Sequence, residues 1–223
     1  MSFLGIICGL QLEAKCFANV GYGDKIRVAI SAAKPDRAEE EARRLCKAGA
    51  KGLLSFGLCG GLDPNLRAGN LVAPNEIKSS GDAWGISPFL VGRSVVRAEA
   101  GLGSDRVIGD VEEKRSLFQS TGCAFVDMES HRIGKICREF NIPFFVLRAV
   151  CDPARQAIPK SAANAIDDAG ATKPFAVAGG LFKHPGEFAD LMRLKKQTDA
   201  AVQTLKTAAR QDVPAILRSV ELV

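Results

Sequence analysis

The sequence has little tryptophan or tyrosine, no block of basic charge and no long apolar run. It holds one Trp and one Tyr in 223 residues, and its 30 Lys and Arg residues are spread along the chain, for a net charge of +5. Nucleic-acid binders usually concentrate basic charge, so we expect no nucleic-acid partner. No run approaches the roughly 18 apolar residues of a membrane-spanning helix. The N-terminal segment lacks a basic leader, and we therefore expect a cytoplasmic protein.

Cysteine motifs are also absent. The seven cysteines are an odd number, and they stand singly in apolar segments without CxxC or Cys/His spacing. This pattern is typical of reduced thiols in a core rather than of a disulfide framework or a zinc site. We therefore expect no metal.

The chain is long for one small domain and short for two, and its hydrophobic content of 47% is ample for a sizeable core. We expect a single domain over residues 1–223. Short, almost continuously apolar runs predict strands buried inside a covered sheet. These runs cover residues 3–10, 25–32, 52–57, 70–77, 123–128 and 142–150.

Helical periodicity separates several of these runs, which predicts an α/β fold. Residues 36–50 place one apolar stripe before a stop at Gly49, and residues 129–141 form a second amphipathic helix. Strand, helix and strand over residues 123–150 predict a crossover unit. A long closing helix is expected from 187 to about 210. Its predicted buried side consists of Phe188, Leu191, Met192, Ala201, Val202 and Leu205.

Acidic residues follow three of the apolar runs. Glu13 follows the first, Asp127 and Glu129 follow the fifth, and Asp152 follows the sixth, directly before Pro153. Ligands of open α/β sheets bind at the carboxyl ends of strands, so these acids are candidate site residues.

Glycines mark another strand end. Gly57, Gly60 and Gly61 stand where the backbone must turn tightly or approach a ligand closely. Taken singly, the acids and the glycines are better explained by structural roles, such as Glu129 at the start of a helix. The glycine pattern matches neither a dinucleotide fingerprint nor a phosphate loop. Taken together, acids that converge on one sheet edge are costly unless they bind or react with something.

Four segments carry a family resemblance. They are "GIICGLQLEA", "FGLCGGLDPNLRAGNLV", "AFVDMES" and "IPFFVLRAVCDPA". In that order they resemble the characteristic segments of the purine nucleoside phosphorylase and methylthioadenosine/adenosylhomocysteine nucleosidase superfamily. The short chain and the tail "KPFAVAGGLFKHPGEFADLMRLKKQT" further resemble its hopanoid-associated phosphorylase branch. The resemblance implies a single-domain α/β/α sandwich whose central sheet is mixed and partly barrel-like.

The resemblance also implies cleavage of a purine ribonucleoside at its N-glycosidic bond. Glu129 would hold the ribose hydroxyls, and Met128 would pack against the ribose. Asp152 would give a proton or hydrogen bond to N7 of the purine, since burial by the apolar strand raises a carboxyl pKa. Asp127 would support these residues without contacting the substrate.

Further residues complete the expected substrate-binding set, namely Phe125, Arg148, Gly57, Gly60 and Gly61. Arg148 lies within the last apolar run, so it would partner an acid or an anion. A structural ion pair, for example with Glu13, explains it equally well.

Departures from the family pattern leave the second substrate open. Glu13 stands where the nucleosidases carry a water-orienting glutamate and the phosphorylases an arginine for phosphate, which favours hydrolysis. Against this, Leu58 replaces a polar residue of the nucleosidases, and the closer branch is called a phosphorylase. We expect no cofactor, with phosphate as a possible co-substrate. The base-stacking aromatic residue of the nucleosidases has no counterpart here.

Three functions follow. The first is release of adenine from a nucleoside with a bulky apolar 5′ group, adenosylhopane-like, in hopanoid biosynthesis. The second is a methylthioadenosine/adenosylhomocysteine nucleosidase. The third is a purine-nucleoside-binding domain without turnover, against which the joint presence of Glu13, Glu129 and Asp152 speaks.

The expected assembly is a homodimer or larger homo-oligomer, as in the family. Residues 173–182 are apolar around Gly179 and Gly180, and they would form a flap beside the ribose 5′ position or an ordinary buried segment. Its apolar side chains are Phe175, Val177, Leu181 and Phe182. A weak membrane association would fit a lipid-linked substrate, although no anchor is visible.

Overall fold

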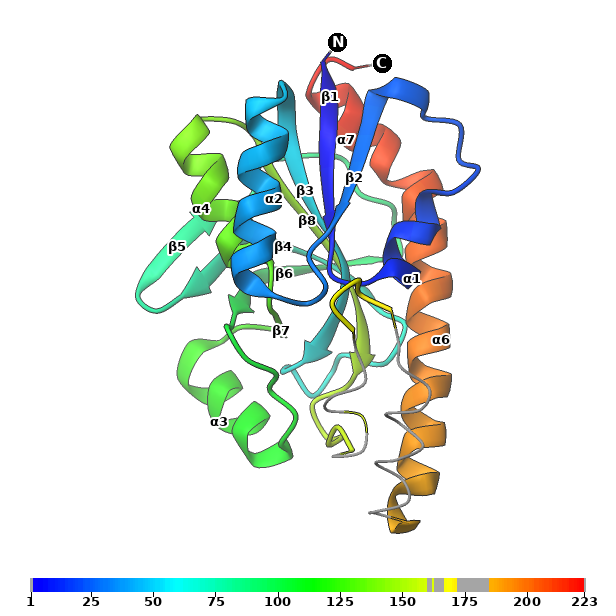
Figure 1. The fold of residues 1–223 in the computed structure, drawn as a ribbon. Coiled ribbons are helices and arrows are strands. Elements are labelled where there is room, and N and C mark those ends of the chain that lie inside the picture. The colour runs from blue at the N-terminus through cyan, green and yellow to red at the C-terminus, as the bar shows by residue number, and fades with distance from the viewer. Residues whose placement is uncertain (1, 160–161, 163–166, 172–184, 223) are drawn as a thin grey trace.

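The protein folds as a mixed sheet with helices on both faces (Figure 1). The computed structural model describes residues 2–159, 162, 167–171 and 185–222. The sheet has eight strands in the order β2-β1-β3-β7-β6-β4-β5, and β8 pairs with both β3 and β4. The strands are β1 (Phe3–Cys8), β2 (Ile26–Ile30), β3 (Ala50–Gly61), β4 (Leu71–Ser79), β5 (Asp82–Gly85), β6 (Val95–Gly103), β7 (Phe125–Asp127) and β8 (Phe144–Asp152).

Five of these strands close into a ring. β3 pairs with β7, β7 with β6, β6 with β4, β4 with β8, and β8 again with β3. β1 and β2 extend the sheet from β3, and β5 pairs with β4. The α/β class and the barrel-like mixed sheet are therefore confirmed.

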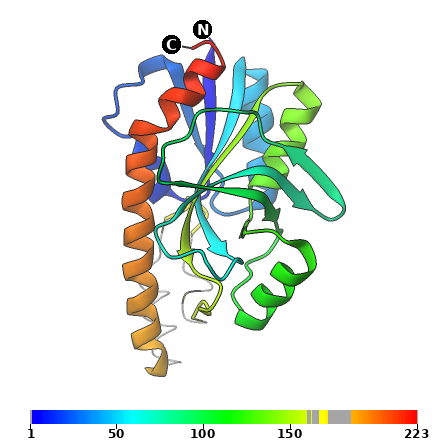
Figure 2. The same ribbon diagram turned by 180° about the vertical axis from the view of Figure 1, so that it is seen from behind.

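Two groups of helices cover the sheet, as Figures 1 and 2 show from opposite sides. The helices are α1 (Gln11–Ala14), α2 (Pro35–Lys47), α3 (Val111–Thr121), α4 (Ser130–Phe140), α6 (Phe188–Gln211) and α7 (Val213–Ser219). β1 serves both cores, since alternate side chains of a strand point to opposite faces. Leu4 and Ile6 pack in the core that contains α6 and α7, whereas Phe3 and Ile7 pack in the core that contains α2 and α4.

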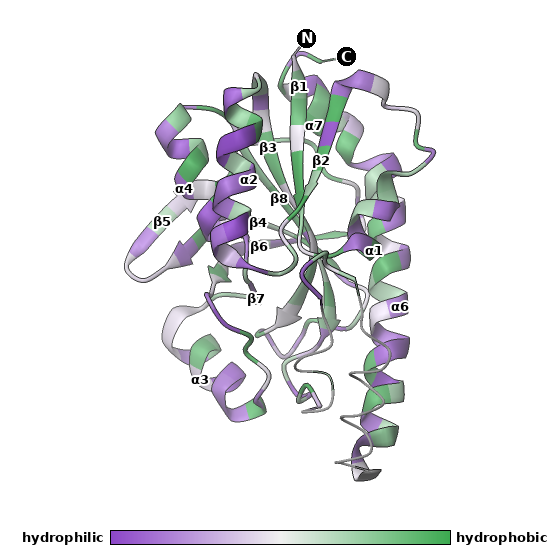
Figure 3. Cartoon of the chain, viewed as in Figure 1, coloured by the Kyte–Doolittle hydropathy of each residue, from purple (hydrophilic) through white to green (hydrophobic). Residues whose placement is uncertain are grey.

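The helices α2 and α4 are confirmed where the periodicity predicts them. Hydrophilic residues colour much of α2 purple in Figure 3, while Ala38, Ala42 and Leu45 are buried. The backbone after α2 adopts φ 96° at Gly49, and Asn141 ends α4 at φ 50°. Both residues are the types that tolerate this left-handed conformation most readily.

The first half of α6 differs from its prediction. Phe188 and Met192 are 57% and 50% exposed, while Ala201 and Leu205 further along are buried. Figure 1 shows the reason, because the first turns of α6 extend past the ends of the strands. The described strands do not reach this end of α6, and its apolar stripe is buried only further along the helix.

The predicted crossover unit is correct in order and wrong in direction. β7, α4 and β8 follow one another, but β7 runs antiparallel to β3 and β8 runs parallel to it. The glycine-rich segment also differs from the predicted turn, because β3 continues through Gly57 and Gly60 to Gly61 without a turn.

None of the described helices is both long and apolar enough to cross a membrane. The expected flap at 173–182 lies outside the described residues and stays a prediction.

Candidate functional site

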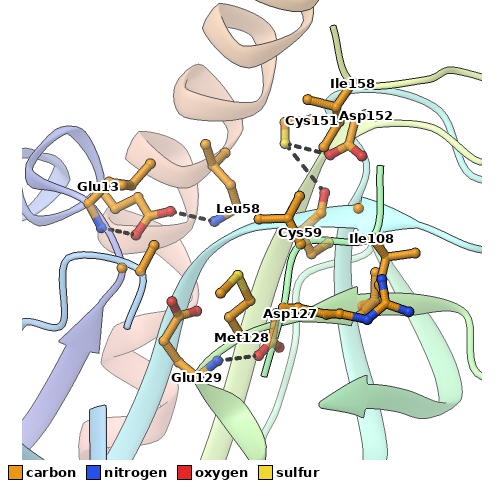
Figure 4. Close-up of a pocket in the computed structure, with 17 residues that line it drawn as sticks. Glu13, Leu58, Cys59, Ile108, Asp127, Met128, Glu129, Cys151, Asp152 and Ile158 are labelled. Carbon is orange, nitrogen blue, oxygen red and sulfur yellow. Dashed lines mark hydrogen bonds between the residues drawn. The ribbon is translucent and has the colours of Figure 1, made fainter. Parts of the chain in front are cut away.

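A pocket opens where β1, β3, β7 and β8 end (Figure 4). Its walls contain Glu13, Gly60, Asp127, Met128, Glu129 and Asp152, which the sequence singles out. Figure 4 places Glu13 and Glu129 toward one end of the pocket and Asp152 toward the other, with Met128 between them. The described structure thus brings the four predicted acids, Glu13, Asp127, Glu129 and Asp152, to one cavity.

Glu13 lies in α1 and is held by backbone donors. Its carboxylate accepts hydrogen bonds from Leu10 N at 2.9 Å and from Leu58 N at 2.8 Å. Burial raises the pKa of Glu13, while Arg148 and the backbone N–H groups oppose the rise. A Cβ atom at position 57 would approach this carboxylate to 2.7 Å, so only glycine leaves room for it. Gly57 therefore serves a close approach, although to a side chain of the protein itself.

Asp127 organises the start of α4. Its Oδ1 accepts hydrogen bonds from the backbone N–H groups of Glu129 and Ser130, at 2.9 and 2.7 Å. The side chain of Glu129 makes no capping hydrogen bond, although this residue stands at the N-cap position of α4. Asp127 performs the capping that could have explained Glu129, so the Glu129 carboxylate does not serve as a helix cap and instead lines the pocket.

Arg148 is the buried cation of this network. Its Nη2 lies 3.1 Å from Glu129 Oε2, and its Nε lies 3.2 Å from Asp127 Oδ2. Nη2 also donates to Ser55 Oγ at 2.5 Å, and Nη1 donates to Leu58 O at 3.2 Å. The expected ion pair with Glu13 is not the one observed, because Glu13 is bound by backbone N–H groups instead.

Glu129 is poised between its two protonation states. Burial raises the pKa of Glu129 to about 7, against the lowering effect of Arg148, and the nearby Asp127 and Glu13 raise it further. A small change in surroundings can therefore change its charge near neutral pH.

Asp152 ends β8 and is likewise buried. Its Oδ2 accepts a hydrogen bond from Lys114 Nζ at 2.6 Å, and its Oδ1 lies 3.0 Å from Cys151 Sγ. Burial raises the pKa of Asp152, and Lys114 is the main opposing influence. The sequence reasoning missed Lys114, although its spacing to Leu117 and Phe118 puts it on the apolar side of α3.

Several predicted binding residues lie behind the pocket wall. Phe125 belongs to the buried core and packs beneath Gly101, where a Cβ atom would come within 2.3 Å of its ring. Gly57, Gly61 and Arg148 are also absent from the residues that line the pocket. Their proposed contacts with substrate stay predictions.

An aliphatic wall completes the pocket and was not predicted. Val107 and Ile108 follow β6, and Ile158 follows β8. Val107 is 51% exposed, so its side chain is available for contact. No aromatic side chain lines this pocket within the described residues.

Comparisons with known proteins agree with this fold. A family model described as Phosphorylase superfamily matches residues 91–176. The chain is 27% identical over 129 residues to a 5′-methylthioadenosine/S-adenosylhomocysteine nucleosidase of Staphylococcus aureus strain JH9, covering 46% of this chain and 57% of that protein. These matches support the Phosphorylase superfamily. The chain thus spans little more than half the length of the curated relatives it matches.

Solved structures resemble almost the whole chain. The 5′-methylthioadenosine/S-adenosylhomocysteine nucleosidase of Helicobacter pylori with butyl-thio-DADMe-Immucillin-A has a TM-score of 0.64 at 16% identity, covering 93% of this chain and 97% of that one. Futalosine hydrolase of the same species has a TM-score of 0.62 at 16% identity, covering 92% and 96%. At this identity the likeness shows the fold, and the hopanoid-associated branch stays a prediction.

We expect Arg148→Met to destabilise the protein by about 3–5 kcal/mol, because it leaves Asp127 and Glu129 buried without their cation. Urea unfolding measures this change. The matched control is Arg115→Met, which removes an exposed pair with Glu112 and is expected to change the free energy of unfolding by about 1 kcal/mol or less. Equal, small losses in both variants would contradict the role given to Arg148.

Proposed function

We propose that this protein is an N-ribosyl purine nucleosidase that releases adenine from a nucleoside. One observation carries the proposal, namely that the buried carboxyl groups of Glu13, Glu129 and Asp152 share one pocket. Cleavage of an N-glycosidic bond needs groups that stabilise a ribosyl cation, protonate the leaving base and activate the incoming water. The three carboxyl groups supply these roles in one cavity.

Glu129 and Met128 are the proposed ribose side of the site. An ionised Glu129 accepts hydrogen bonds from the ribose hydroxyls, and these bonds strengthen as the sugar gains positive charge. Arg148 holds this carboxylate from behind, 3.1 Å from Oε2. Met128 lines the pocket beside it and offers a polarizable apolar surface to the sugar.

Asp152 is the proposed acid for the base. A neutral carboxyl group donates its proton to N7, while its second oxygen accepts a hydrogen bond from the 6-amino group of adenine. A 6-oxopurine presents two acceptors at these positions and fits less well. Burial favours the neutral form of Asp152, as this role requires.

Glu13 is the proposed base for water, and hydrolysis is therefore the favoured reaction. Its carboxylate lies near that of Glu129, since a Cβ atom added at Gly9 would lie 2.9 Å from Glu129 Oε1 and 3.4 Å from Glu13 Oε2. Among the described residues that line the pocket, Arg106 carries the only positive charge, and it is paired with Glu113. Phosphate would therefore have to compete with Glu113 for Arg106.

The 5′ substituent decides between the two nucleoside substrates. Leu10, Ala33 and Leu58 line the pocket together with Glu13 and would suit an apolar group. An adenosylhopane-like substrate follows from the resemblance of the tail, whereas methylthioadenosine or adenosylhomocysteine follows from the staphylococcal and Helicobacter relatives. The ratio of kcat/KM for adenosylhopane and methylthioadenosine separates them. Homo-oligomerisation and membrane association stay predictions.

Glu13→Gln is expected to lower kcat by about 10²- to 10⁴-fold, because the amide cannot take a proton from water. Binding of a non-cleavable adenosine analogue should change much less, since the proposed role of Glu13 lies in the chemical step. Glu112→Gln, at an exposed carboxylate, is the control. Retention of near wild-type turnover in Glu13→Gln would remove it from the mechanism.

Asp152→Asn keeps the shape of the side chain and removes the transferable proton. Turnover of an adenine nucleoside should fall by about 10²- to 10⁴-fold with a much smaller change in KM. The wild-type protein should also cleave adenosine in preference to inosine. If the variant retains turnover, or if inosine is preferred, Asp152 is not the purine acid and the proposed function fails.

The pH dependence should carry the signature of Glu129. A carboxyl group with a raised pKa is ionised above that pKa, so ribose binding through Glu129 is present above pH 7 and is lost below it. We expect kcat/KM to fall about tenfold per pH unit below pH 7, because this ratio reports the free protein. Initial rates at subsaturating substrate, from pH 5 to 9, measure it. A profile that stays flat down to pH 5 contradicts the assignment.

A further inference from the structure

Lys114 is a lysine without any exposed surface, which is rare unless the ammonium group is fully bound. It lies in α3, and its Nζ donates to Asp152 Oδ2 at 2.6 Å, to Gln156 O at 2.9 Å and to Asp152 O at 3.0 Å. Pro153 O is a weaker fourth partner at 3.4 Å. An ammonium group has three N–H donors, so the three short contacts use them all.

The position of Lys114 relative to the pocket limits what it can do. Asp152 lines the pocket, and Lys114 does not. Asp110 caps the N-terminus of the helix that carries Lys114, because its Oδ1 accepts a hydrogen bond from Glu113 N at 2.9 Å and so fixes the first turn. Lys114 therefore acts on a bound molecule through Asp152.

The other groups that face Asp152 do not replace this cation. Cys151 on the same strand lies 3.0 Å from Oδ1, and burial raises the pKa of its thiol, which keeps it neutral. Cys59 on β3 is also buried with a raised pKa. Glu13 and Asp127 also line the pocket, but carboxyl groups cannot supply a cation. Of the described groups facing the Asp152 carboxyl, Lys114 provides the direct ion pair.

We propose that Lys114 is a positioning residue that fixes the carboxyl group of Asp152 and stabilises its ionised form after the proton has left, and so sets the upper pH limit of the reaction. This inference rests on the proposed function. In the proposed step the O–H bond of Asp152 breaks and an N7–H bond forms, with the O–H electron pair left on the carboxylate. The C1′–N9 electron pair enters the purine ring, water adds to the ribosyl cation and gives one proton to Glu13, and Lys114 keeps its protons.

Burial and Lys114 act on the pKa of Asp152 in opposite directions. Burial alone favours the neutral acid, which would then release its proton reluctantly. The ammonium group 2.6 Å from Oδ2 favours the carboxylate that the reaction produces. Removal of the ammonium group should therefore weaken the acid without removing it.

The test is the pH profile of kcat in Lys114→Met. We expect the plateau of kcat to fall about 10- to 100-fold, part of the effect typical of general acid catalysis, and the alkaline limb to move to higher pH. Lys114→Arg, which retains the charge, should keep the limb near its wild-type position. Arg115→Met, at the exposed neighbouring residue of α3, should leave the profile unchanged. A lower plateau with an unmoved alkaline limb would overturn the proposal.

A measurement without turnover separates this inference from the proposed function. The ¹³Cγ resonance of Asp152, assigned by its loss in Asp152→Asn, should titrate at higher pH in Lys114→Met than in the wild-type protein. Lys114→Gln, which can still donate to the carbonyl groups, serves the same purpose if the methionine variant does not fold. An unchanged midpoint overturns the role of Lys114. A shifted midpoint in a protein that releases no base supports the pairing and rejects the nucleosidase function.

Discussion

The guanidinium group of Arg148 is the interaction on which the rest of the site depends. It is buried in the middle of β8, and its hydrogen bonds and ion pairs join β3, β8 and the start of α4. Asp127 and Glu129 would otherwise be two like charges in a desolvated space, and such groups shed their charge by protonation. One cation shared between them keeps Glu129 close to its midpoint, with a pKa of about 7.

The same pocket treats each of its carboxyl groups differently. Glu13 is held by backbone N–H groups, Glu129 by Arg148, and Asp152 by Lys114. Different surroundings give neighbouring carboxyl groups different pKa values, and one cavity can then supply both an acid and a base. The glycines of β3 belong to this arrangement, because they leave room for two of these carboxyl groups. A Cβ atom added at Gly57 would lie 2.7 Å from the Glu13 carboxylate, and one added at Gly60 would lie 3.1 Å from Asp152 Oδ2.

The sequence predicts more of the core strands and the acids than of their partners. Continuous apolar runs locate β1, β3 and β8, because strands covered on both faces leave that signature. The strand β6 was not predicted, because charged and apolar residues alternate in it. The predicted direction of β7 was wrong, because a strand of three residues is too short for its sequence to indicate how it pairs. The spacing within α3 could have shown that Lys114 is buried, but its pairing with Asp152 and the partners of Arg148 depend on contacts between distant segments, which spacing along the chain does not encode. The Phe188 end of α6 was misjudged for the same reason.

Base release by the wild-type protein in the absence of phosphate tests the nucleosidase function most directly. Adenosine, methylthioadenosine and adenosylhopane are each incubated with the protein, with and without phosphate, and the purine and sugar products are identified. We predict free adenine and free sugar from at least one of the three nucleosides, at a rate that phosphate does not change. Adenine that appears only after phosphate is added, together with a sugar 1-phosphate, would contradict the role of Glu13, and no adenine under either condition would contradict the nucleosidase function itself.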